Sequence, residues 1–203
     1  SVSDVRLDAA YTGDSVTVGK LAFENESGTS VELSGSIDRI FGAGEYRLRG
    51  GVSGLRVGET SRADTIVYGD KLADYVGEKF SDLLARYQPA GTCDITGTVS
   101  GRLDDKDSYR IEGVCSFENA TARYAKFPYR LENVTGTLKL KDRSLIADMT
   151  AEHDEVDLKI EAKVANLTGR RRYDVHITSD NLQLDSDLYR AMNRRQQKAW
   201  FTF

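Results

Sequence analysis

The sequence predicts a mainly β protein, built from curved antiparallel meander sheets with one amphipathic helix per repeat. Three observations lead to this fold class. Apolar and polar residues alternate along most of the chain, as in strands with one packed face and one wet face. Eighteen glycines against two prolines fit many tight turns. Helical spacing of apolar residues begins in only two places, at about 69–88 and at about 187–203.

The first third of the chain is a series of alternating runs separated by short turns. Within residues 16–23 the phase of the alternation changes by one residue, which predicts a β-bulge at Gly19-Lys20. The runs Val31 to Ile37 and Tyr46 to Val52 then alternate cleanly around a glycine-rich turn. Each run places its apolar groups on one face only, which is typical of an antiparallel sheet.

The predicted helix at 69–88 is apolar along one stripe and charged on the opposite side. Pro89 cannot continue it, and Gly91 releases the backbone into the next strand. The apolar stripe is expected to pack the helix against the sheet. Its residues are Leu72, Val76, Phe80, Leu84 and Tyr87.

After the helix, alternating runs continue as far as Ile177. Two of these runs flank a turn at 104–108. If Leu103 pairs with Tyr109, Cys115 lies opposite Gly97 and about four residues along the strands from Cys93. That separation exceeds the roughly 7 Å between Cα atoms that a disulfide allows, so we expect two free thiols in the core.

The chain also contains an internal repeat. A shift of 127 residues takes Val31–Ile37 onto Leu158–Val164 and Tyr46–Leu48 onto Tyr173–Val175. The helical segment recurs as well, beginning near Asp187. We therefore expect two repeat units, residues 1–88 and 89–203, each made of strands and a helix, in a fragment of a longer repeat protein.

Residues that could carry chemistry are sparse. His153 lies between Glu152 and Asp154, but neighbouring residues in a strand or turn point apart, so a hairpin turn is the preferred interpretation. His176 has no partner within reach in the sequence. The acidic turn at 104–107 lacks the glycine and glutamate of a calcium loop. We expect no enzyme activity, no metal and no cofactor.

Charge and hydropathy exclude two further classes. The net charge of −4 gives no basic surface for nucleic acid. No run approaches the roughly 20 apolar residues of a membrane-spanning helix. A membrane anchor is therefore expected only outside this chain.

The apolar positions of the strands remain to be explained, because a long apolar face cannot stay in water. The residues alone favour a sheet that curls and buries this face as a closed core. The alternative is a groove that holds an apolar ligand. The residues expected to line the core or groove are Val31, Leu33, Ile37, Tyr46, Leu48, Val99, Ile111, Phe117, Leu138, Leu140, Leu158, Ile160, Val164, Val175 and Ile177.

Three segments resemble the AsmA-like family of bacterial envelope proteins, which includes the TamB and YhdP types. They are Asn181–Asp185 before the C-terminal helical segment, Tyr87–Ile95 after the first helix, and Ala120–Leu138. The resemblance implies a non-enzymatic, repeating β-groove in the periplasm, anchored in the inner membrane in the full-length protein. Phospholipid or other lipid acyl chains are its implied partners, together with other envelope proteins.

The resemblance therefore favours the groove over the closed core. A second hypothesis stays open: a structural or adhesion β-domain of a surface or secreted protein, with a closed, dry core. A hydrolase is a distant third, and it would need a cleft that gathers His153 or His176 with carboxylates.

Overall fold

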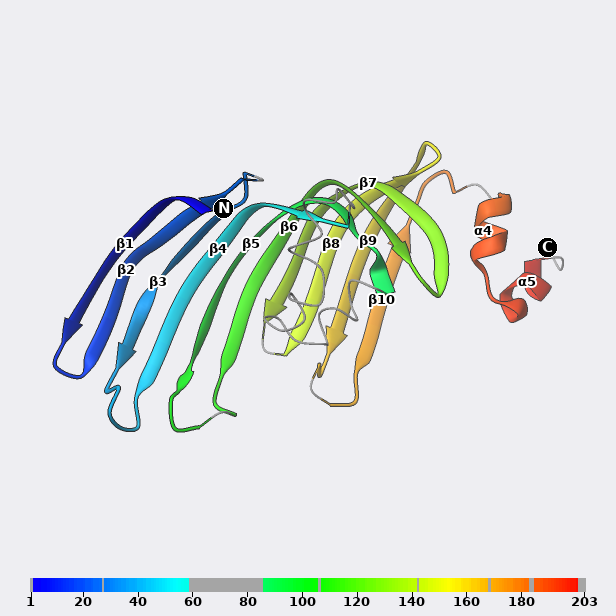
Figure 1. Ribbon diagram of the computed structural model, residues 1–203. Coiled ribbons are helices and arrows are strands. Elements are labelled where there is room, and N and C mark those ends of the chain that lie inside the picture. Colours follow the sequence, from blue (N-terminus) through cyan, green and yellow to red (C-terminus); the bar gives the residue numbers. More distant parts are fainter. Residues whose placement is uncertain are drawn as a thin grey trace.

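The computed structural model describes residues 2–26, 28–58, 86–105, 107–141, 143–167, 169–182 and 185–200. Their strands form one ten-stranded sheet in which each strand pairs with the next in sequence order, always antiparallel (Figure 1). The strands are β1 (Val2–Thr12), β2 (Ser15–Asn25), β3 (Ser30–Asp38), β4 (Glu45–Val57), β5 (Ala90–Arg102), β6 (Arg110–Tyr124), β7 (Phe127–Lys141), β8 (Ser144–His153), β9 (Val156–Ala165) and β10 (Arg172–Thr178).

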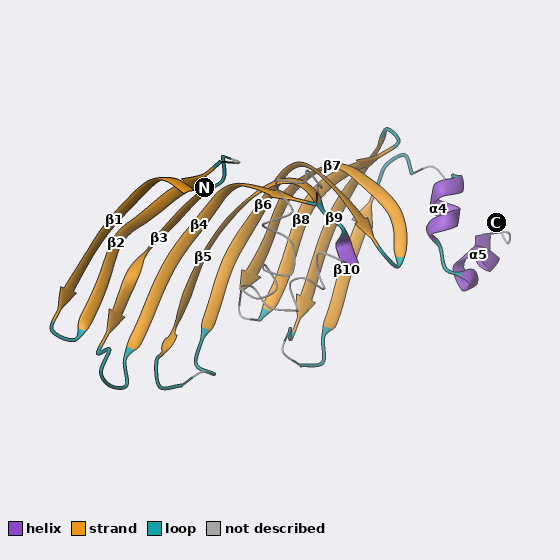
Figure 2. Ribbon diagram, in the orientation of Figure 1, coloured by secondary structure: helices purple, strands orange, loops and turns teal. Residues whose placement is uncertain are grey.

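The sheet is not closed, because β1 and β10 form its two edges and do not pair with each other. Strands make up most of the described chain (Figure 2). The predicted mainly β, antiparallel meander is thereby confirmed. The sheet also continues across residue 88, where the two repeat units were expected to meet, since β4 pairs with β5.

The C-terminal segment forms two short helices, α4 (Ser186–Ala191) and α5 (Arg194–Trp200), where one helix over about 187–203 was expected. Met192 is extended and ends α4. Asn193 begins α5, because its side-chain oxygen accepts hydrogen bonds from the amides of Arg195 and Gln196, each at 3.0 Å. A side chain that caps a helix start in this way favours a new helix over continuation of the old one.

The first predicted helix, at 69–88, lies mostly outside the described residues. Leu72, Val76, Phe80 and Leu84 belong to that part. Arg86 and Tyr87 are helical, and the Tyr87 ring stacks on Tyr124 of β6 with ring centroids 5.1 Å apart. Burial raises the pKa of the Tyr87 phenol, as does the nearby Tyr124. This end of the segment therefore lies against β6.

Bulges bend the sheet, and one of them was predicted. The pairing of β2 with β3 shifts between Val18 and Leu21, which confirms the bulge at Gly19-Lys20. Further register shifts interrupt β6 and β7, at Asn119 and Asn133, whose φ angles are 52° and 48°. Because a bulged strand bends and twists more strongly, β7 arches over in Figure 1.

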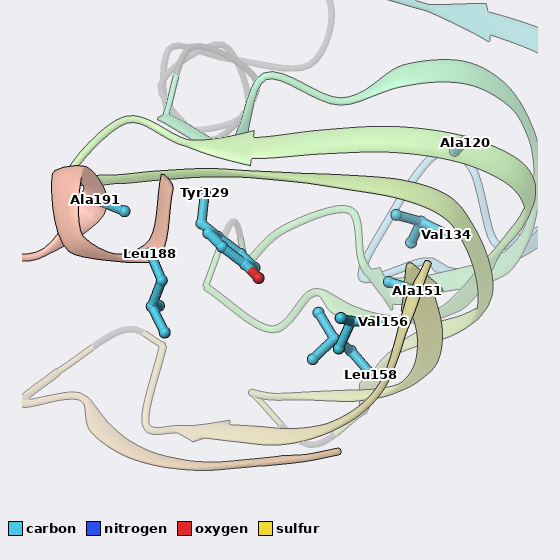
Figure 3. Close-up of a cluster of buried hydrophobic side chains, with 8 residues drawn as sticks. All are labelled: Ala120, Tyr129, Val134, Ala151, Val156, Leu158, Leu188 and Ala191. Atoms are coloured by element: carbon cyan, nitrogen blue, oxygen red, sulfur yellow. The ribbon is translucent and has the colours of Figure 1, made fainter. Parts of the chain in front are cut away.

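A cluster of buried apolar side chains lies inside this bend (Figure 3). Helix α4 packs against β7 and contributes two of its members. The cluster consists of Ala120, Tyr129, Val134, Ala151, Val156, Leu158, Leu188 and Ala191. One end of the sheet therefore has a packed core.

The cysteine hairpin differs from the predicted register by two residues. Cys115 lies opposite Ile95, not Gly97, and Cys93 lies opposite Phe117. The predicted pairing of Leu103 with Tyr109 does not form, because the Leu103 amide donates to the carbonyl of Gly44 at 2.9 Å.

This register makes Cys93 and Cys115 diagonal neighbours and corrects the wider separation expected from the sequence. Both are free thiols, as predicted. A hydrogen bond between them raises the pKa of Cys115, and burial raises it further. The same bond lowers the pKa of Cys93.

Candidate functional site

One face of the sheet carries an uninterrupted row of apolar residues from β2 to β10. Residues directly opposite each other in an antiparallel pair project from the same face, so the pairing registers define this row. None of its members is charged or carries a polar group stronger than a thiol. The row consists of Phe23, Val31, Val52, Ile95, Cys115, Leu138, Ala147, Ala162 and Val175.

The opposite face is polar at the same level of the sheet. Ion pairs lie on it. Lys20 of β2 pairs with Glu32 of β3 at 2.8 Å, and Lys159 pairs with Glu161 along β9 at 3.0 Å. Its equivalent row consists of Asp94, Ser116, Thr137, Asp148, Glu161 and His176. The sheet is therefore two-faced, with one apolar side and one hydrated side.

All of the lining residues predicted from the sequence lie on the apolar face, because they stand an even number of residues from members of the apolar row in strands without an intervening bulge. Their exposure differs along the sheet. Leu158 is 5% exposed and belongs to the buried cluster, whereas Ile111, Val175 and Ile177 are 44%, 53% and 60% exposed. The others are half-buried. The face is thus packed near the bend and open elsewhere.

Glycines hollow this face near its middle. Gly50, Gly97 and Gly113 lie opposite one another in β4, β5 and β6, between the larger Leu33 and Leu140 in the same row. Beside them lies a depression of about 270 Å³. Its lining is apolar except for Glu32 and consists of Leu21, Phe23, Val31, Glu32, Leu33, Gly50, Gly51, Val52 and Ile95. Such a surface can hold an apolar chain, and its described lining offers no nucleophile.

The two histidines, for which the sequence predicts no catalytic role, lie apart in the structure. His153 ends β8 and is followed by the turn at Asp154-Glu155, as expected, but its ring is buried. His176 has a partner that the sequence analysis missed: its Nε2 lies 3.0 Å from Oδ1 of Asp174, two residues away on the same face. The two histidines lie on different strands, β8 and β10, and on opposite faces.

The acidic turn at 104–107 is tied to β5. The Arg102 guanidinium contacts both carboxylate oxygens of Asp104, at 3.0 and 2.7 Å, and this bond holds the pKa of Asp104 below its usual value. Asp105 accepts a hydrogen bond from the Asp107 amide at 3.0 Å. These contacts fix a turn, so these two aspartates are engaged without an ion.

No protein-family model matches the chain, and comparison with curated proteins and with solved structures gave no match either. Among the described residues, no helix is long and apolar enough to cross a membrane.

Proposed function

We propose that this chain is a non-enzymatic segment of an AsmA-like cell-envelope protein that binds or conducts lipid acyl chains along its apolar face. The observation that carries the proposal is the apolar row, which continues across nine neighbouring strands, β2 to β10, with a polar row behind it from β5 to β10. The resemblance adds the location, the periplasm, and a membrane anchor in the full-length protein.

The dimensions of the row suit acyl chains. At about 4.8 Å between strands, it runs for about 38 Å. An acyl chain extends about half of the roughly 30 Å hydrocarbon core of a bilayer, so the row is more than twice as long as one chain. No charged residue interrupts the row from Phe23 to Val175. A bound acyl chain would therefore meet no charged side chain that halts its movement along the row, which suits conduction as well as binding.

The energy available is sufficient for such a ligand. Burial of one methylene group contributes about 0.8 kcal/mol, so a chain that buries about half of its surface gains about 0.4 kcal/mol per carbon. The exposed side chains of the face, such as Val175 and Ile177, would also lose contact with water when a lipid chain covers them, which adds to the binding free energy. Mutual burial would stabilise both the lipid and the sheet.

A structural or adhesion domain with a dry core is the second candidate. The buried cluster, whose members come from β6, β7, β8, β9 and α4, favours it, because that part of the apolar face is covered by protein side chains. This alternative predicts that the apolar face binds no lipid.

A fluorescent fatty acid titration separates the two. Val175 is exposed on the apolar face, and His176 is exposed on the opposite face of the same strand. Val175→Glu places a charge beside the bound chain and weakens binding, whereas His176→Glu leaves it unchanged. Absence of saturable binding by the unmodified protein, or equal effects of the two substitutions, contradicts the proposal.

A further inference from the structure

Three side chains from two separate parts of the fold meet where α4 approaches the β8–β9 hairpin. His153 is the last residue of β8, Asp154 lies in the turn, and Asp185 caps the start of α4. Nε2 of His153 lies 3.8 Å from Oδ2 of Asp154 and 3.9 Å from Oδ2 of Asp185. One ligand atom from each residue lies within 4.8 Å of those of the others.

The imidazole is buried and held in one orientation. The His153 side chain is 7% exposed, and its ring packs on Tyr129 with ring centroids 3.7 Å apart. Its Nδ1 lies 2.6 Å from the carbonyl oxygen of Arg130. A carbonyl only accepts hydrogen bonds, so Nδ1 carries the proton and donates.

This tautomer leaves Nε2 of the neutral ring as a lone pair directed at two carboxylates. Nε2 has no hydrogen-bond partner among the described residues, and a buried polar atom without a partner carries a free-energy cost. Nε2 of His153 and one carboxylate oxygen each from Asp154 and Asp185 therefore surround a point where a positive charge would be stabilised. A proton on Nε2 does not bridge gaps of 3.8 and 3.9 Å, which exceed the length of a hydrogen bond.

We propose that His153, Asp154 and Asp185 bind a divalent transition-metal ion of the Zn²⁺ class. A zinc ion with ligands at about 2.0–2.2 Å in tetrahedral geometry holds them about 3.4 Å apart. The two gaps from Nε2 of His153, 3.8 and 3.9 Å, close to that value when each shortens by about half an ångström. Asp154 can move this far because its side chain is 75% exposed.

The surroundings match the known design of metal sites. A metal-bound histidine typically donates its second ring N–H to a backbone carbonyl or a carboxylate, which fixes the ring, and Arg130 provides that carbonyl. The imidazole favours Zn²⁺ over Ca²⁺ and Mg²⁺, which prefer oxygen ligands throughout. The ion would join α4 to the end of the sheet, where Leu188 and Ala191 complete the buried cluster.

Calorimetric titration of metal-depleted protein with ZnCl₂ tests the site. The informative variant is Asp185→Asn, because asparagine caps a helix as well as aspartate does but is a poor zinc ligand. Asp187→Asn is the matched control: it lies in the first turn of the same helix and pairs with Arg190 at 3.3 Å, outside the cluster. Asp154→Asn changes an exposed side chain and keeps the packing intact.

We expect the unmodified protein and Asp187→Asn to bind one Zn²⁺ per chain with equal affinity. Asp185→Asn and Asp154→Asn should each bind at least about tenfold more weakly, with circular dichroism spectra like that of the unmodified protein. Zn²⁺ should also raise the melting temperature of the unmodified protein more than that of either variant. No Zn²⁺ binding, affinity equal in all four proteins, or binding of Ca²⁺ in preference to Zn²⁺ would overturn the proposal.

Discussion

Ile95 of β5 lies directly opposite Cys115 of β6, and both side chains project from the apolar face. The sequence suggested Gly97 as the partner of Cys115. The difference is two residues, and a shift of two returns every side chain to the same face of a strand. The apolar face is therefore independent of this error, although the positions of the two thiols along the strands are not.

Engineered cysteines test this register. In a Cys93→Ser background, Ile95→Cys is expected to form a disulfide with Cys115 under mild oxidation, because directly opposite residues of an antiparallel pair have Cα atoms about 4.5–5.5 Å apart, within the range that a disulfide spans. Val99→Cys is the control, since Val99 pairs with Ile111 and lies too far along the strand. The measurement is the mass loss of two hydrogens on oxidation. A bridge in the Val99 variant, or none in the Ile95 variant, contradicts the register.

Gly136 has a backbone that other residues rarely adopt. Its φ is +144°, and a Cβ atom there would clash with the carbonyl oxygen of Asp148 on β8. We expect Gly136→Ala to lower the free energy of unfolding by about 1–3 kcal/mol or more, as measured by urea denaturation.

Gly169 provides the control for that substitution. A Cβ atom added there meets no other atom within 4 Å, so Gly169→Ala should change stability by less than about 0.5 kcal/mol. Equal stability of the two variants would mean that β7 and β8 do not approach each other as closely as they do here.

Two neighbouring positions on the apolar face, one on β9 and one on the edge strand β10, predict different costs of truncation. Leu158 is 5% exposed in the buried cluster, so Leu158→Ala should cost about 2–5 kcal/mol of unfolding free energy. Ile177 projects from the same face but is 60% exposed, and Ile177→Ala should cost less than about 1 kcal/mol. Thermal or urea unfolding measures both. A large cost at Ile177 would show that this part of the face is also packed shut.

The sequence predicted the features that depend on the local periodicity of apolar residues. Alternation with period two located the strands and their apolar face, and the break in phase located the bulge at Gly19-Lys20. It paired β5 with β6 but did not predict their register, because the Leu103 amide bonds to Gly44, a residue of a different turn. Nor did it predict the end of α4 at Met192, where the cap at Asn193 begins a second helix.

The grouping of His153 with Asp185 was also beyond the sequence. The two residues are separated by β9 and β10, and only the packing of α4 brings them together. In the sequence, the carboxylates next to His153 are those of Glu152 and Asp154. The sequence offers one usable signal for this pairing: an aspartate, Asp185, placed to cap a helix far along the chain from His153. That signal becomes specific only when the fold is known.

The central claim, that the apolar face binds acyl chains, is tested most directly by native mass spectrometry of gently purified protein, with lipid extraction from the same sample. The account predicts adducts of phospholipid or fatty acid mass that are lost on extraction. It also predicts that a Val175→Glu, Ile177→Glu double variant carries fewer of them than a variant with the opposite-face changes Asp174→Asn and His176→Gln. Lipid-free protein that takes up no fatty acid or phospholipid when these are added would contradict the account and favour a dry core.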